Sequence, residues 1–125
     1  KYINLVREEN NIKDERAQPF VKQLHYHLGI LSKFTDWIKE KIKNSPEDAS
    51  GACNDYLKVL GLVATGHAWL KVLEVSFNEY DSNKDFYEDK IQTANFFYNR
   101  ILPRIDSNYI TATTGSNYIM NYKFN

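Results

Sequence analysis

Three histidines are the residues of this chain best suited to binding a metal or moving a proton. His25 and His27 are two positions apart, which places them on different sides of a helix, and His67 lies on a separate segment. A zinc site needs three or four convergent ligands, and paired helical ligands are usually four positions apart. We therefore predict no metal site. For His67, between Gly66 and Ala68, we favour a buried position with one hydrogen-bond partner.

Cys53 is the only cysteine, so the chain has neither an intrachain disulfide nor a multi-cysteine metal site. A single free cysteine is compatible with a reducing compartment. No base is adjacent to this thiol in sequence, which favours a small core or surface residue over a nucleophile. The sequence also lacks the glycine-rich motifs that hold nucleotide phosphates. We predict no catalytic and no cofactor-binding residue in this chain.

Small residues interrupt the most apolar segment, which runs from Tyr56 to Val75. A glycine inside a helix costs roughly 1 kcal/mol relative to alanine, so a helix that contains two of them is expected to use the missing side chains. The expected use is close approach of another backbone. We predict a helix-contact seam that consists of Gly61, Ala64, Gly66 and Trp69.

Three long helices must position these residues. Apolar residues at alternating three- and four-residue intervals predict a first helix over 17–43. Ser45 and Pro46 are typical of a helix start, so the second helix is expected from Pro46 to about Tyr80, unless Gly51 breaks or delays it. Asp85 and Glu88 resemble a capping box that opens the third helix.

Pro103 predicts a kink near Asn99 in the third helix, because proline has no amide hydrogen and clashes with the preceding turn. After residue 107 the chain is polar and predicts an irregular tail. Its aromatic residues are hard to bury internally and suggest docking against another surface; they are Tyr109, Tyr118, Tyr122 and Phe124.

The resulting fold is an all-α, antiparallel up-down bundle of three long helices, with a fourth short helical segment left open. Residues 1–16 are expected to be a linker or the end of an upstream helix, 17–107 the bundle and 108–125 the C-terminal tail. With 16 basic and 16 acidic residues the formal charge is zero, which disfavours nucleic-acid binding. We expect no membrane span and a cytoplasmic location.

Three segments together resemble the extra C-terminal helical domain of long bacterial acyl-CoA dehydrogenases, the group that includes 3-methylmercaptopropionyl-CoA dehydrogenase. They are DYLKVLGLVATGHAWLKVLEVS, DFYEDKIQTANFFYNRILPRI and TTGSNYIMNYKFN. In the first, the matching residues are Tyr56, Leu57, Lys58, Gly61, Gly66 and Trp69. In the second, they are Phe86, Tyr87, Lys90, Thr93, Ala94, Phe96, Phe97, Tyr98, Leu102 and Pro103. The first helix also fits, through Leu28, Leu31, Thr35, Asp36 and Trp37. His67 and the asparagine-rich tail depart from the family pattern.

This resemblance implies that FAD, the acyl-CoA substrate and the catalytic carboxylate belong to an upstream dehydrogenase core, and that the parent protein is a homo-oligomer. The chain itself would have a structural or subunit-contact role. The alternative is a free-standing helical module that binds a partner protein through the seam or the aromatic tail.

Overall fold

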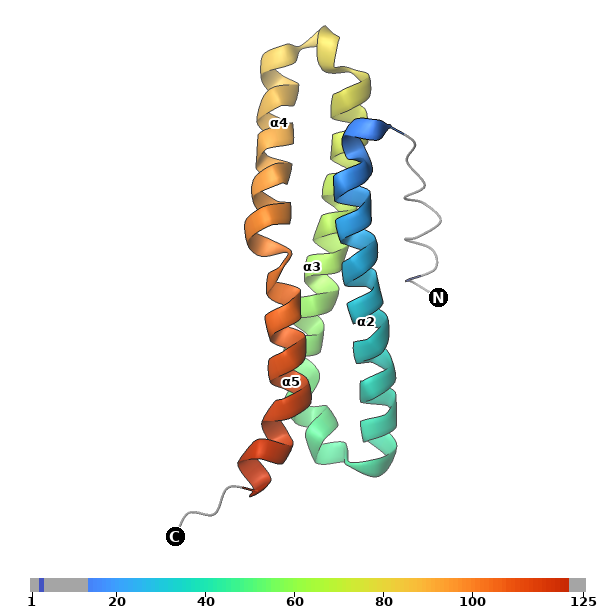
Figure 1. Cartoon of the computed structure of the whole chain (residues 1–125), viewed down its shortest axis with the longest axis vertical. Helices are drawn as coiled ribbons and strands as arrows, with labels where there is room; N and C mark the ends of the chain where they lie inside the picture. The colour runs from blue at the N-terminus through green and yellow to red at the C-terminus, as the bar shows by residue number, and fades with distance from the viewer. Residues whose placement is uncertain (1–2, 4–13, 122–125) are drawn as a thin grey trace.

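The chain forms helices joined by short turns (Figure 1). The computed structural model describes Ile3 and residues 14–121, with side chains described as far as residue 114. The predicted all-α class is confirmed, because these residues contain no strand. The predictions for residues 1–2 and 4–10, for the side chain of Tyr118 and for Tyr122 and Phe124 lie outside the described part. The elements are a short 3-10 turn η1 (Glu15–Ala17), α2 (Gln18–Asn44), α3 (Pro46–Asn78), η2 (Tyr80–Ser82), α4 (Lys84–Phe96), a π-helical turn η3 (Phe97–Ile101) and α5 (Arg104–Asn121).

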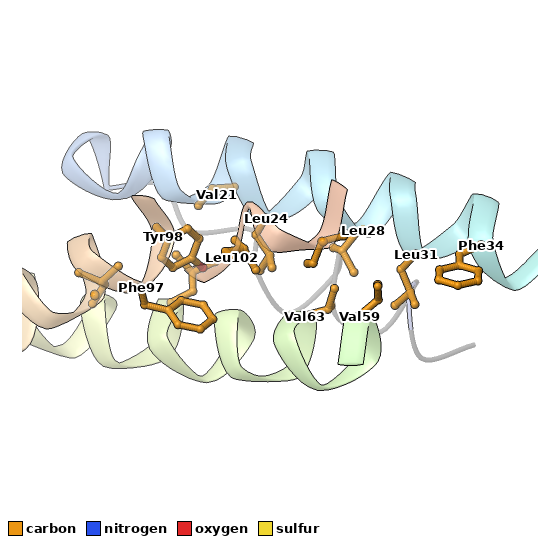
Figure 2. Close-up of a cluster of buried hydrophobic side chains, with 14 of the residues drawn as sticks. Val21, Leu24, Leu28, Leu31, Phe34, Val59, Val63, Phe97, Tyr98 and Leu102 are labelled. Atoms are coloured by element: carbon orange, nitrogen blue, oxygen red, sulfur yellow. The ribbon is translucent and has the colours of Figure 1, made fainter. Parts of the chain in front are cut away.

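The core lies where α2, α3 and α5 meet. Figure 1 shows α2 and α3 side by side and antiparallel, with α4 and α5 following the length of α3 in turn. The apolar stripe read from the first helix is buried on α2, and Figure 2 shows it facing α3. Its members are Val21, Leu24, Leu28, Leu31 and Phe34, and they meet Val59, Val63, Leu70 and Leu73 of α3.

Ser45 joins α2 to α3 in a different way from the one predicted. Its side chain makes no hydrogen bond to a free amide; its hydroxyl donates instead to Oδ2 of Asp48 at 2.8 Å. The backbone N–H of Ser45 donates to the carbonyl of Lys41 and so closes α2. Pro46 occupies the first turn of α3, as predicted, where its missing N–H costs nothing.

Helix α3 is continuous across Gly51, so this glycine neither breaks nor delays it. By length and composition α3 is also the one helix in the described ranges that could cross a membrane, although we expected no membrane span from the sequence. The core helix of a protein outside the membrane meets the same criterion, so this finding is weak evidence for a span. A third of the most apolar 18-residue stretch of α3 is buried within the chain, which leaves much of the surface of this stretch exposed.

The third predicted helix consists of two segments. Asn83 begins α4, since its side chain accepts a hydrogen bond from the N–H of Phe86 at 3.3 Å; the capping box predicted at Asp85 and Glu88 is therefore wrong. The kink predicted near Asn99 falls at the π-helical turn η3, in which the N–H of Leu102 donates to the carbonyl of Phe97 at 2.8 Å. This wider turn precedes Pro103, which cannot continue an α-helical ladder.

The irregular tail predicted from residue 108 is wrong as far as Asn121, because α5 continues to that residue. Hydroxyl side chains in this segment bond to the preceding turn of the helix: Thr113 donates to the carbonyl of Tyr109 at 2.9 Å. Tyr109 itself is half-buried and packs edge-on against Phe34 of α2, with ring centroids 5.4 Å apart. The domain is thus able to cover this aromatic residue internally.

Candidate functional site

The residues that could do chemistry are dispersed. His25 is exposed on α2, His67 is partly exposed on α3, and Cys53 is an exposed free thiol. His67 is therefore less buried than we expected. Within the described ranges no group of three histidine, cysteine, aspartate or glutamate residues could hold a metal ion. None of the glycines described has a positive φ, the conformation that opens a backbone cradle for phosphate.

Gly66 is the residue of the predicted seam that makes a close contact inside the chain. A Cβ atom there would lie 3.2 Å from Cδ1 of Leu24 on α2 and 3.4 Å from Cδ1 of Leu102. The missing side chain thus lets α2 and the turn before α5 approach α3. Gly66 is buried, and its carbonyl accepts a hydrogen bond from the hydroxyl of Tyr98 at 2.7 Å.

Tyr98 connects α2, α3 and the turn η3 around Gly66. Figure 2 shows it beside Leu24 and Leu102. It is completely buried, and this burial raises the pKa of its hydroxyl, which remains protonated and able to donate. Its carbonyl accepts a hydrogen bond from the side-chain amide of Gln23 on α2, and Phe20 packs edge-on against its ring at 5.2 Å. These contacts hold η3 in place against the two long helices.

The other three seam residues do not share this environment. No atom of the described residues lies within 4 Å of a Cβ placed on Gly61, Ala64 is exposed, and Trp69 is partly buried at the edge of the core. The predicted seam is therefore not one contact surface within this chain, because Gly61 and Gly66 are five positions apart and so point to opposite sides of a helix. A contact of Gly61 or Ala64 with another part of a larger protein stays a prediction.

Gly61 and Ala64 belong instead to a second apolar surface, which we call the open α3 face. Its residues recur every three or four positions over about 27 Å of helix, on the side opposite the buried leucines. Leu57 and Val75 are 57% and 52% exposed and lie at its two ends, with small residues between them. The face consists of Leu57, Gly61, Ala64, Ala68, Val72 and Val75.

The open α3 face continues onto α4. Val72 and Val75 line a shallow groove of about 430 Å³ with Phe86, whose side chain is 50% exposed. Lys90 lies at the rim, with its ammonium 5.2 Å from the centre of the Phe86 ring. Apolar residues that are contiguous over two helices in this way are typical of an interaction surface.

The third histidine, His27, is buried, as its place on the flank of the apolar stripe of the first helix predicts. His27 is 3% exposed; its Nδ1 lies 3.0 Å from the carbonyl of Gln23, and its Nε2 has no hydrogen-bond partner among the described residues. Asp106 of α5 lies 4.0 Å from that nitrogen. Desolvation lowers the pKa of His27, partly opposed by its backbone hydrogen bond and by Asp106. The position of His27 on the flank of the α2 stripe was the signal for its burial.

Comparison with known proteins identifies the family of this chain. A search of curated proteins and a search of solved structures each found no match. The family described as acetyl-CoA dehydrogenase C-terminal like matches residues 3–123, nearly the whole chain. The match covers α3 with both of its faces and the η3 turn around Tyr98. The chain therefore belongs to this family of C-terminal domains of acyl-CoA dehydrogenase-like proteins.

Proposed function

We propose that this chain is the structural accessory domain of an FAD-dependent acyl-CoA dehydrogenase and that it does no chemistry itself. The single observation that carries the proposal is the family match over residues 3–123. The dispersal of His25, His67 and Cys53 agrees with it, because acid–base catalysis needs such groups within hydrogen-bond reach of one reacting atom.

The chemistry of the parent protein follows from this assignment. A carboxylate of the upstream core would remove a proton beside the thioester carbonyl of an acyl-CoA, and FAD, held by the same core, would accept the hydride. The 3-methylmercaptopropionyl-CoA dehydrogenase type, a homo-oligomeric parent and a cytoplasmic location belong to the same proposal. They rest on the resemblance of the three quoted segments to that group.

The role of the domain is to add a packed helical unit that the parent uses for contact. The open α3 face supports this, because Leu57, Val72 and Val75 would lose exposed apolar surface against a partner. Each Å² of apolar surface removed from water contributes about 25 cal/mol. Gly61 and Ala64, which lie between Leu57 and Val72 on this face, would let a partner helix approach closely. We propose that the upstream core, or the core of a neighbouring subunit, covers this face.

Spectroscopy of the longer gene product tests the proposal. It should be yellow, with a flavin absorption that an acyl-CoA bleaches, and it should pass electrons to a dye. Replacement of His25, His67 and Cys53 together by alanine should leave kcat unchanged, since none of these residues would touch substrate or flavin. A colourless product, or a loss of kcat in this triple variant, would contradict the proposal.

The second candidate is a free-standing module that binds another protein. The observation in its favour is the same open α3 face, extended by Phe86 of α4. The coding sequence upstream of Lys1 discriminates between the two candidates. An open reading frame that continues upstream through a dehydrogenase core favours the accessory domain, whereas a stop codon followed by a start codon directly before Lys1 favours the free-standing module.

A further inference from the structure

A second surface hollow lies between α3 and α5, beside the open α3 face. It is a groove of about 640 Å³, within the range of sites that hold small molecules. Four of its residues come from α3 and three from the first turns of α5. They are Lys58, Gly61, Leu62 and Thr65, followed by Arg104, Ser107 and Asn108.

The groove is positively charged, although the chain as a whole has no net charge. Lys58 and Arg104 line it from opposite helices, and no carboxylate is among the lining residues. In the part of the chain that the structure describes, neither cation forms an ion pair. Two cations that face one hollow repel each other, so an anion between them would be attracted by both.

The other lining residues suit a polar ligand with several oxygen atoms. Ser107 and Asn108 offer a hydroxyl and an amide, and both are able to donate hydrogen bonds. Gly61 keeps the hollow open, because a Cβ atom at this position would meet nothing within 4 Å. Leu62 is partly buried and supplies an apolar wall on the same side.

We propose that this groove binds a small molecule through a phosphate or diphosphate group. A phosphate carries close to two negative charges at neutral pH, which matches the two cations, whereas a carboxylate carries one. Arginine binds phosphate oxygens with two parallel N–H groups, and lysine binds them as a point charge. The volume exceeds that of one phosphate, so the rest of the ligand would lie over Leu62 and Thr65. This inference does not depend on the proposed function.

Titration of the 125-residue chain with inorganic pyrophosphate, followed by ¹⁵N NMR at constant ionic strength, tests the site. We expect saturable shifts of the amides of Gly61, Thr65 and Ser107. The double variant Lys58→Gln/Arg104→Gln should bind at least tenfold more weakly. The matched control Lys33→Gln/Lys39→Gln removes two exposed charges from α2 and should bind as the parent chain does.

Two further measurements separate a site from general charge attraction. Gly61→Leu should fill the groove and weaken binding several-fold, with an unchanged circular dichroism spectrum. Tighter binding of ADP than of pyrophosphate would show that the ligand is a nucleotide. Equal affinities would show that the groove recognises the phosphate groups alone. The proposal is overturned by shifts that do not saturate, by equal weakening in the α2 control, or by citrate that binds as tightly as pyrophosphate.

Discussion

The two faces of α3 are both apolar, yet only one of them is covered. On the closed face Gly66, Leu70 and Leu73 pack against α2 and the region around Tyr98. On the open face Leu57 and Val75 are 57% and 52% exposed, and a Cβ atom on Gly61 would meet no atom of the described residues within 4 Å. A helix that is apolar all round is normally buried all round. The difference indicates that α3 builds this domain with one side and is available to another surface with the other.

The largest expected difference between the faces comes from leucine truncation. Leu70→Ala on the closed face removes a completely buried side chain and should lower the free energy of unfolding by about 2 to 5 kcal/mol. Leu57→Ala on the open face removes a side chain that is 57% exposed and should change it by less than about 0.5 kcal/mol. Urea unfolding of both variants makes the comparison, and equal losses would show that the open face is covered.

The two glycines give the next largest difference. Gly66→Leu should overpack the contact with Leu24 and Leu102 and destabilise the chain by about 1 to 3 kcal/mol. Gly61→Leu should stabilise it by up to about 1 kcal/mol, because leucine is the better helix former and the space is open. Thermal melts of the two variants should therefore move in opposite directions. A Tm lowered to the same extent in both would contradict two distinct faces.

Two hydroxyl groups that bond to helix carbonyls provide a smaller test. Tyr98→Phe removes the buried bond to the carbonyl of Gly66 and should cost about 0.5 to 1.5 kcal/mol. Thr65→Ala removes an exposed bond to the carbonyl of Gly61 and should be neutral or slightly stabilising. Guanidinium unfolding distinguishes the two, and a larger loss for Thr65→Ala would reverse the comparison.

His27, which is buried on α2, should make the stability of the folded chain modestly dependent on pH. Its pKa is lowered by burial, so the unfolded chain takes up more protons than the folded chain below about pH 6.5. Stability should therefore fall as the pH drops from 6.5 to 5.5, by at most about 1.4 kcal/mol. His27→Asn should flatten this slope, and the same change at exposed His25 should leave it intact. A slope that persists in His27→Asn would assign it to other groups.

Much of the fold follows from local pattern, because burial on α2 and α3 repeats with the period of a helix. The start of α3 at Pro46 and an interruption before Pro103 were predictable because proline suits the first turn of a helix and cannot continue its hydrogen-bond ladder. The helical tail was not, since its threonines and asparagines favour loops, and the packing of Tyr109 on Phe34 was not visible in the sequence. The groove at Lys58 and Arg104 depends on how α5 lies along α3, which no local pattern specifies.

The predicted seam shows most clearly what local sequence pattern does not specify. The seam prediction grouped Gly61 with Gly66, although five positions turn a helix by more than a third of a circle beyond one turn. Small residues on a helix indicate that something approaches closely. They do not indicate whether the approaching surface belongs to the same chain; here the described residues approach Gly66 and leave open space at Gly61.

Thiol labelling of the open face tests the central claim most directly. The variant Cys53→Ser/Ala64→Cys places one thiol in the middle of this face, where Ala64 is exposed. In the 125-residue chain it should react with a maleimide as fast as an exposed thiol. In the longer, flavin-containing protein the rate should fall at least tenfold and recover on unfolding. Equal rates in the two proteins would show that the open α3 face does not dock, and would contradict the account.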